Sequence, residues 1–591
     1  MSSLPPGIIL ILGPLLLPFF SGKLLIQRAI ALALPVLSCW HMASMPDGFV
    51  YEMTMFGYEM MPVRVDSLSL VWGYVFHIAA FLSVIYALHV KDTLQHVSGV
   101  MYAGAAIGAA FAGDLITLFI FWELTAITSV FLIWANRTPT SGKVGTRYLI
   151  IQVGSGVILL FGVMLWANDT GSVLFDAFQP AADDPKQLVG MFVDPETMGP
   201  KSLAAWLVLL AFGIKAAFPF LHNWLQDSYP NGTVTGTVFL SAFTTKLAIY
   251  ALARGFAGTD MLIYVGAIMT LFPIFFAVIE NDLRKVLAYS LNNQLGYMVV
   301  GIGIGTQLAL NGTAGHAFAH IIYKGLLFMA MGAVLFRTGT IKANQLGGLY
   351  KSMPVTTVCC IIGALSISGF PLFSGFVTKS MTLSAAFHLD TGWLFVALLI
   401  ASAGVVDHSG IKIPFFAFFA HDNGWKVDPA PKNMQVAMVL AAAICIFLGV
   451  YPDPLYALLP FDVNDAYHGD VWHNYSGWHI MTSLQLLLFA ALAFALLYRA
   501  KLYPPELEKL NVDTDVVYRK WAPALLRRVG ASLLELYDIF CTDSKRLIAH
   551  IVARVSGYHA PNSVLGEPWP TGISALWAGI LLAGFLVLGL F

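Results

Sequence analysis

The segment Gly213-Ile-Lys-Ala-Ala-Phe-Pro-Phe-Leu-His-Asn-Trp-Leu225 places a lysine inside an apolar run and follows it with a proline. Pro219 removes one backbone hydrogen bond and kinks or breaks the helix. Carbonyl groups freed at membrane depth need protein or water around them, and a charge at the centre of a bilayer costs at least about 2.5–3.5 kcal/mol. We therefore expect Lys215 to occupy a hydrated functional site beside a helix break.

A second segment has the same character and reads Gly369-Phe-Pro-Leu-Phe-Ser-Gly-Phe-Val-Thr-Lys379. Gly369, Pro371 and Gly375 are expected to break the twelfth predicted span. The two broken spans lie five spans apart, and an odd offset gives two repeats opposite orientations. This arrangement is typical of an inverted repeat with its sites at the repeat interface. The sequence therefore predicts that spans 4–8 and 9–13 form two related units.

The composition is that of a membrane protein. Of the 591 residues, 58% are hydrophobic and 11% are charged, whereas a soluble domain has about 25% charged residues. Apolar runs of about 20 residues recur along the chain and do not alternate as in a barrel. We predict an all-α polytopic membrane protein with about 16 spans, centred near residues 13, 33, 77, 104, 124, 157, 212, 243, 270, 295, 322, 370, 399, 441, 488 and 581.

The cysteines indicate no cofactor. The five cysteines include no Cys-x-x-Cys pair, so we expect no disulfide framework, zinc site or iron–sulfur cluster, and no metal or other cofactor. Residues Gly7 to Phe20 follow no basic segment and are interpreted as a retained first span rather than a cleaved signal peptide.

The distribution of basic residues predicts the topology. Loops after odd-numbered spans hold 24 lysines and arginines, and loops after even-numbered spans hold four. Basic loops face the cytoplasm, so we expect both termini on the non-cytoplasmic side, a polar outer loop at 168–202 and a basic cytoplasmic stretch at 500–570. Within that stretch, Asp515 to Gly557 has helical spacing, interrupted by Pro523. It is either an interfacial amphipathic helix or a lateral helix that braces a neighbouring subunit.

Four lysines lie inside long apolar stretches, and the other 28 lysines and arginines are expected outside them; the four are Lys215, Lys246, Lys324 and Lys379. Glu123, in Phe121-Trp-Glu, is similarly placed. It is interpreted either as a packing contact to a basic group or as a switching ion pair that changes a buried lysine's proton affinity. Lys246, midway along the eighth span, either belongs to this series or extends to the membrane interface.

His316, His320 and Lys324 are spaced at i, i+4 and i+8 and therefore share one helix face. We interpret them as a proton relay. Metal binding by the two histidines is the other interpretation, but no carboxylate or cysteine is nearby in sequence and Lys324 would repel a cation.

Weaker candidates lie near span ends. His222 and Asp227 follow Pro219 and are candidates for proton uptake from the cytoplasm. Asp407 and His408, near the end of the thirteenth span, are candidates for a proton exit.

At these residues the chain resembles the antiporter-like membrane subunits shared by respiratory complex I and the Mrp-type sodium/proton antiporters. The resemblance runs from about residue 100 to 430, is closest to the D-type Mrp subunits, and departs from the complex I relatives at Ser380, where an aspartate is common. The matching segments are Phe121-Trp-Glu, Lys215 to Trp224, Thr233 to Tyr250, Asp282-Leu-Arg-Lys-Val-Leu-Ala-Tyr-Ser290, His316-x3-His-x3-Lys324 and Gly369 to Lys379.

The resemblance implies a 14-span core of two inverted five-span units. It also implies a central row of hydrated charges in which Glu123 pairs with Lys215, followed by Lys246, His316, His320, Lys324 and Lys379. The expected segments are N-terminal spans at 1–95, repeat units at 96–255 and 256–430, C-terminal spans at 431–500, the amphipathic arm at 501–570 and a last span at 571–591.

The expected function is proton translocation within a multisubunit sodium/proton antiporter of a bacterial inner membrane, with no catalytic chemistry in this chain. The expected partners are other membrane subunits, protons, sodium ions and the bilayer, and not nucleic acid. Three alternatives remain. The chain would otherwise be a proton-pumping subunit of a quinone oxidoreductase, the membrane partner in a bicarbonate-accumulating complex, or a scaffold without a transport role, whose buried lysines would tolerate Met or Leu.

Overall fold

The computed structural model describes residues 4–55, 57–176, 178–181, 184, 186–389, 392–467, 471–507 and 511–590. The outermost residues of the predicted first and last segments, 1–3 and 591, lie outside this description. The chain forms two compact units, Met1–Asn511 and Val512–Phe591. Each unit is described by itself.

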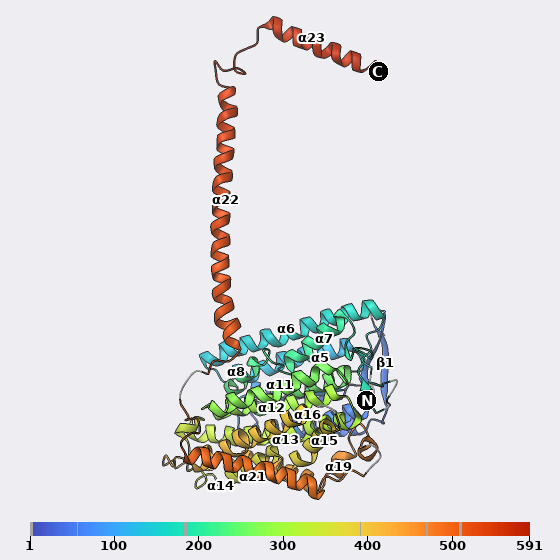
Figure 1. The fold of residues 1–591 in the computed structure, drawn as a ribbon, viewed down its shortest axis with the longest axis vertical. Coiled ribbons are helices and arrows are strands. Elements are labelled where there is room, and N and C mark those ends of the chain that lie inside the picture. The colour runs from blue at the N-terminus through green and yellow to red at the C-terminus, as the bar shows by residue number, and fades with distance from the viewer. Residues whose placement is uncertain are drawn as a thin grey trace. The chain divides into compact units, whose positions relative to one another are not determined.

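The first unit is built from helices that run side by side (Figure 1). Apolar residues on nearly every turn make these helices suited to lipid or to the interior of a bundle. In its first half the helices are α1 (Ile8–Leu12), the 3₁₀ helix η1 (Gly13–Phe20), α2 (Leu24–Ala43), α3 (Ser67–Ala87), α4 (Thr93–Ala110), α5 (Leu115–Trp134), α6 (Pro139–Thr170), α7 (Leu203–Lys215), α8 (Asn223–Asn231), α9 (Gly236–Ala242) and α10 (Thr244–Phe256).

The second half of this unit contains the same kind of helix, with two π-helical turns, η3 and η4. Its elements are α11 (Asp260–Ile279), α12 (Leu283–Ile304), α13 (Gln307–Thr338), the 3₁₀ helix η2 (Ala343–Gln345), α14 (Pro354–Ser368), α15 (Ser374–Phe387), α16 (Gly392–Val405), η3 (Val406–Ile411), α17 (Lys412–Pro414), η4 (Phe415–Phe419), α18 (Lys432–Val450), α19 (Asp453–Tyr456), α20 (Val463–Ala466) and α21 (Gly477–Arg499).

Both predicted helix breaks are present. One separates α7 from α8 around Pro219, and the other separates α14 from α15 around Pro371. A third break, at Phe243, divides α9 from α10 and was not predicted. The centres of the sixteen predicted spans all fall in a helix or in the break between two helix halves. The chain is therefore an α-helical polytopic protein with interrupted helices at its centre.

The hydropathy of the described residues identifies eleven helices long and apolar enough to cross a membrane, and three shorter apolar helices. This number is lower than the sixteen predicted spans because some predicted spans form helices that are too short or too polar for this criterion. One of them is α12, which carries Arg284, Lys285, Asn292 and Asn293. Such a helix is tolerated in a membrane protein when its polar face is covered by other helices.

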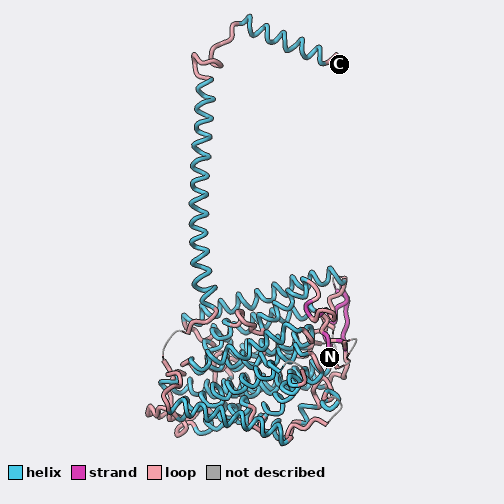
Figure 2. The backbone as a smooth tube through the Cα atoms, viewed as in Figure 1, coloured by secondary structure: helices cyan, strands magenta, loops and turns pink. Residues whose placement is uncertain are grey.

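Short strands were not predicted and gather at one end of the helical unit (Figure 2). Three antiparallel pairs form, β1 (Val50–Met55) with β2 (Tyr58–Arg64), β3 (Gln179–Pro180) with β4 (Leu188–Val189), and β5 (Val193–Asp194) with β6 (Gly199–Pro200). The segment of β3 to β6 packs over helix ends, because Leu188 N–H donates to Gly305 O and Gly190 N–H donates to Ala257 O.

The second unit contains η5 (Val517–Trp521), α22 (Ala522–Tyr558) and α23 (Thr571–Leu588). The predicted interruption at Pro523 takes the form of a widened turn. The π-helical turn η5 runs directly into α22, whose second residue is Pro523, and a proline has no N–H to donate and crowds the turn before it. α22 then continues for its 37 residues. None of the residues of α22 is buried, and both interpretations of the arm stay open.

Candidate functional site

Lys215 is the last residue of α7 and is fully buried. Its Nζ donates to Trp122 O at 2.6 Å and to Thr125 Oγ1 at 3.1 Å, and it lies 4.3 Å from the centre of the Trp122 ring. The Glu123 carboxylate on the same turn of α5 is the anion that acts on this ammonium group. No ion pair within 4.0 Å joins the two among the described residues. Glu123 and Lys215 are therefore neighbours that do not form a direct ion pair.

Glu123 rests against a glycine of the next helix. A Cβ atom added at Gly156 of α6 would lie 1.3 Å from Glu123 Oε1, so only glycine permits this position of the carboxylate. Glu123 Oε1 is buried and has no hydrogen-bond partner among the described residues. Gln152 lies one turn earlier on the same face of α6, and its fully buried amide also has no hydrogen-bond partner there. Buried polar groups of this kind are usually satisfied by ordered water.

Lys246 lies in the first turn of α10, directly after the break at Phe243. Its Nζ donates to Ser241 O at 2.5 Å, across that break, and the side chain is fully buried. The Trp72 indole donates to Lys246 O at 2.9 Å, so the backbone at this break is held by α3. The burial of the side chain argues against the interpretation that Lys246 extends to the membrane interface.

The three basic residues of α13 lie on one buried face, as their spacing predicted. The His316 and His320 ring centres are 6.0 Å apart. His316 Nδ1 is 3.4 Å from Thr378 Oγ1. Among the described residues, the two ring nitrogens of His320 and the Nζ of Lys324 have no hydrogen-bond partner, and both side chains are fully buried. These groups require water or an ion-pair partner to offset their burial.

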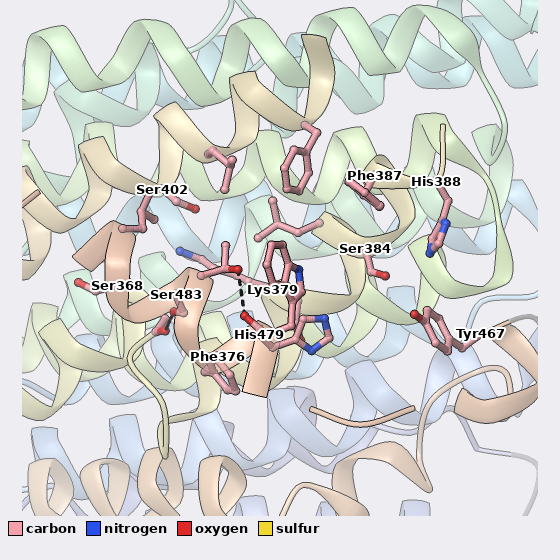
Figure 3. Close-up of a pocket in the computed structure, with 18 residues that line it drawn as sticks. Ser368, Phe376, Lys379, Ser384, Phe387, His388, Ser402, Tyr467, His479 and Ser483 are labelled. Carbon is pink, nitrogen blue, oxygen red and sulfur yellow. Dashed lines mark hydrogen bonds between the residues drawn. The ribbon is translucent and has the colours of Figure 1, made fainter. Parts of the chain in front are cut away.

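Lys379 lies in the second turn of α15, after the second helix break. Its Nζ donates to Ile367 O at 2.6 Å and is 5.4 Å from the centre of the Tyr297 ring. The lysine also lines a cavity of about 300 Å³ between α15, α16 and α21 (Figure 3). Ser368 and Ser402 lie at one end of the cavity, and His388 and Tyr467 lie at the other.

Buried lysines of α10, α13 and α15 act on the basic side chains of α13. Lys246, Lys324 and Lys379 all contribute to the potential at His320, and Lys246 and Lys379 contribute to the potential at Lys324. The structure therefore brings four of the predicted residues into one electrostatic cluster, with His316 beside it. Glu123 and Lys215 form a separate pair in the first half.

The weaker candidates have specific contacts. His222 packs its ring 4.6 Å from the Phe272 ring, and Asp227 pairs with Arg147 at 3.2 Å. Asp407 and His408 lie together in the π-helical turn η3. The described residues contain no group of three or more histidine, cysteine, aspartate or glutamate side chains that could hold a metal ion.

Some basic residues that were expected in loops lie inside apolar helices, and the expectation is wrong for them; Lys412 and Arg254 are two that are also buried. Lys412 lies in the apolar stretch Gly392–Phe419 and Arg254 in Gly236–Phe256, and each is 1% exposed. Lys412 Nζ donates to the carbonyl oxygens of Ala277, Val278 and Glu280. Arg254 donates both bonds of a bidentate pair to Asp66 at 2.8 Å. The apolar residues on both sides of Lys412 were the signal that could have found it.

Comparison with known proteins agrees with the family resemblance that the sequence indicates. The family model described as NADH:quinone oxidoreductase/Mrp antiporter, TM matches residues 112–403. The D subunit of the Na(+)/H(+) antiporter of Alkalihalophilus pseudofirmus is 30% identical over 364 residues, which are 59% of this chain and 71% of that protein. The A subunit of the Na(+)/H(+) antiporter of the same organism is 29% identical over 476 residues, which are 71% of this chain and 58% of that protein.

The fold is also found among solved structures. A chain of the Mrp complex from Dietzia sp. DQ12-45-1b superposes with a TM-score of 0.74 and 21% identity, covering 93% of this chain and 62% of that chain. This chain thus spans less than two thirds of that Mrp chain and of the A-type relative. The family model, the relatives and the buried charges agree, and the chain belongs to the NADH:quinone oxidoreductase/Mrp antiporter family of membrane subunits.

Proposed function

We propose that this chain is the proton-translocating subunit of a multisubunit Na⁺/H⁺ antiporter in a bacterial inner membrane. The observation that carries the proposal is the cluster of Lys246, His320, Lys324 and Lys379, in which all four side chains are buried and Lys246 and Lys379 act on both His320 and Lys324. His320 and the Lys324 amine have no hydrogen-bond partner among the described residues. Such a cluster destabilises the fold. Its presence is explained by the transfer of protons.

The proposed path begins at Lys215 and Lys246, passes the His316, His320 and Lys324 face of α13, and reaches Lys379. From there the cavity provides the exit, because its Ser384 side leads to His388 and Tyr467 (Figure 3). Both of these residues belong to loops that follow even-numbered spans, which the distribution of basic residues places outside the cytoplasm. Both chain termini lie on that same side in this proposal.

Glu123 is the proposed control element. Its carboxylate is beside Lys215 without a direct ion pair among the described residues, so a small movement closes or opens the pair. One unit of pKa is worth about 1.4 kcal/mol, and one buried ion pair therefore suffices to drive a proton step. Displacement of Glu123 by a neighbouring membrane subunit would couple this chain to the rest of the complex, in which sodium is carried by a partner.

Replacing either member of the pair tests this function. Glu123→Ala and Lys215→Ala, produced in the whole complex, are expected to abolish sodium-driven proton flux in vesicles. Lys143→Ala, at an exposed position of the neighbouring helix α6, is the control and should leave the flux unchanged. Normal flux in a correctly assembled Lys215→Ala complex would refute the assignment.

The second candidate is a proton-pumping subunit of a quinone oxidoreductase, because the matching family model covers both classes of protein. Purification of the native complex separates the two. Flavin and iron–sulfur subunits would identify the oxidoreductase, and small hydrophobic subunits without redox centres would identify the antiporter.

A further inference from the structure

The thirteenth predicted span departs from α-helical geometry over its second half. After α16 the chain forms the π-helical turns η3 and η4, separated by Lys412–Pro414. Pro414 has no N–H to donate and its ring crowds the preceding turn, which favours a widened helix. Single π-helical turns are rare and occur frequently at functional sites. The turn η3 contains both Asp407 and His408.

His408 faces the buried basic cluster. It is fully buried, and Lys324, Lys379 and Lys412 are the charged groups that act on it. Its Nδ1 is 2.8 Å from Ser409 Oγ, which donates to Ser290 Oγ at 2.6 Å. Its Nε2 has no hydrogen-bond partner in the part of the chain that the structure describes. The ring is thus oriented through Nδ1 and leaves Nε2 available for proton exchange.

Asp407 lies on the other side of the same turn. It is partly exposed, and the Tyr503 hydroxyl lies 3.4 Å from its Oδ2. The Asp407 and Glu506 carboxylates both act on Lys412. The Lys412 ammonium group donates hydrogen bonds to three carbonyl groups at the end of α11, where a cation is favoured. Asp407 thus contacts Tyr503, and Lys412 contacts the end of α11; both contacts adjoin loops that follow odd-numbered spans.

The turn η3 also adjoins the cavity beside Lys379. A Cβ atom at Gly410 would lie 2.3 Å from Ser368 Oγ, so η3 packs tightly on the end of α14 where the cavity begins. The mouth of the cavity, at His388, adjoins the beginning of α16, whereas His408 lies past its end. Lys379 thus lines the cavity, and His408, on which Lys379 acts, lies beyond the opposite end of α16 from the His388 side of the cavity.

We infer that His408 is a further proton-transfer residue, which gives the Lys324 and Lys379 amines access to the basic, cytoplasmic face through Asp407. The Nε2 of His408 accepts a proton from the Asp407 side and donates it to a neutral lysine amine, so the imidazole returns to its neutral form. This inference rests on the proposed function and reverses the exit role that the sequence suggested for Asp407 and His408. Lys379 then exchanges protons alternately through His408 and through the cavity.

Thiol labelling tests the sidedness independently of transport. In the full complex, with the five native cysteines of this chain replaced, Asp407→Cys should react with a membrane-impermeant thiol reagent only from the face that carries the basic loops. Ser384→Cys, in the cavity, should react only from the opposite face. Labelling of both positions from one face, or no labelling at position 407, would overturn the inference. The result does not depend on whether Lys215 or Glu123 is required for flux.

Flux measurements test the role of the imidazole. His408→Gln should lower sodium-driven proton flux by at least about tenfold, as expected when a proton-transfer group is lost, and Asp407→Asn should lower it while Asp407→Glu retains most of it. His550→Gln, at an exposed position of α22, is the control. If His408→Gln keeps its flux within twofold of the parent in an assembled complex, His408 transfers no proton. If the variant does not assemble, the labelling experiment decides.

Discussion

Ala217 and Gly369 occupy the same position in two copies of one backbone turn. Both have a positive φ, +61° and +75°, and the residue three positions later, Phe220 or Leu372, has a φ of +68° or +74°. In each turn the intervening phenylalanine N–H donates to the carbonyl five residues earlier at 3.0 Å. Two breaks five spans apart therefore share one geometry, as expected of two copies of one unit.

This shared turn predicts that substitutions at the two positions change stability in opposite directions. Gly369→Ala forces a side chain into the left-handed region at a cost of about 1–2 kcal/mol, whereas Ala217→Gly removes such a cost. Thermal denaturation of the purified complex should show a lower transition temperature for Gly369→Ala and an unchanged or higher one for Ala217→Gly. A stabilising Gly369→Ala substitution would contradict the assigned conformation.

The contact between Glu123 and Gly156 predicts that one added methyl group displaces the carboxylate. Gly156→Ala should lower sodium-driven proton flux about tenfold or more, because misplacing a transfer group by about 1 Å costs up to 10²-fold. Gly154→Ala is the matched control on the same helix, since nothing lies within 4 Å of its Cβ position. Equal flux in both variants would show that the position of Glu123 does not matter.

The cavity beside Lys379 predicts a steric block. Ser384→Leu places an apolar side chain in a space of about 300 Å³, so we expect proton flux to fall several-fold while the complex assembles normally. Ser384→Ala keeps the space open and should retain the flux. The comparison uses proton release from vesicles, and equal release by both variants would exclude the cavity as the exit.

The Asp66–Arg254 pair predicts a pH-dependent stability. Burial alone would raise the pKa of Asp66, but Arg254 and Arg64 outweigh it and lower that pKa. Because the folded-state pKa is the lower one, the stabilisation is complete above the ordinary value of about 3.9 and is lost as the pH falls through the lowered value.

Asp66→Asn should therefore destabilise the protein at neutral pH by about 3 kcal/mol, because it leaves Arg254 buried without an anion. Its difference from the parent should shrink below about pH 4. Asp92→Asn is the control, since the partner of Asp92, Arg137, is 73% exposed and a surface pair contributes about 0–1 kcal/mol. Thermal denaturation at several pH values provides the measurement, and a pH-independent difference would contradict the ion-pair explanation.

The sequence predicted those features that depend on local chemistry. Pro219 and the Gly369-Phe-Pro segment break their helices because a proline or glycine acts on its own turn. The spacing of His316, His320 and Lys324 predicted their shared face for the same reason. Pro523 acts locally in the same way, since the π-helical turn η5 lies directly before it, although the helix continues beyond the proline.

Features that depend on distant partners were not predictable. The apolar residues around Lys412 indicate its burial but not its partners, which are three carbonyl groups at the end of α11. The bidentate contact of Arg254 with Asp66 joins residues 188 positions apart. The β1–β2 hairpin likewise requires no apolar alternation, because its first strand is exposed on both faces.

The mutual influence of Lys246, Lys324 and Lys379 limits how the cluster can be loaded. Like charges repel strongly where water is scarce, so a second proton in the cluster is disfavoured while the first remains. In the proposed function, each arriving proton would therefore expel the one ahead of it, and the number of protons held by the amines would stay nearly constant while protons advance one site at a time.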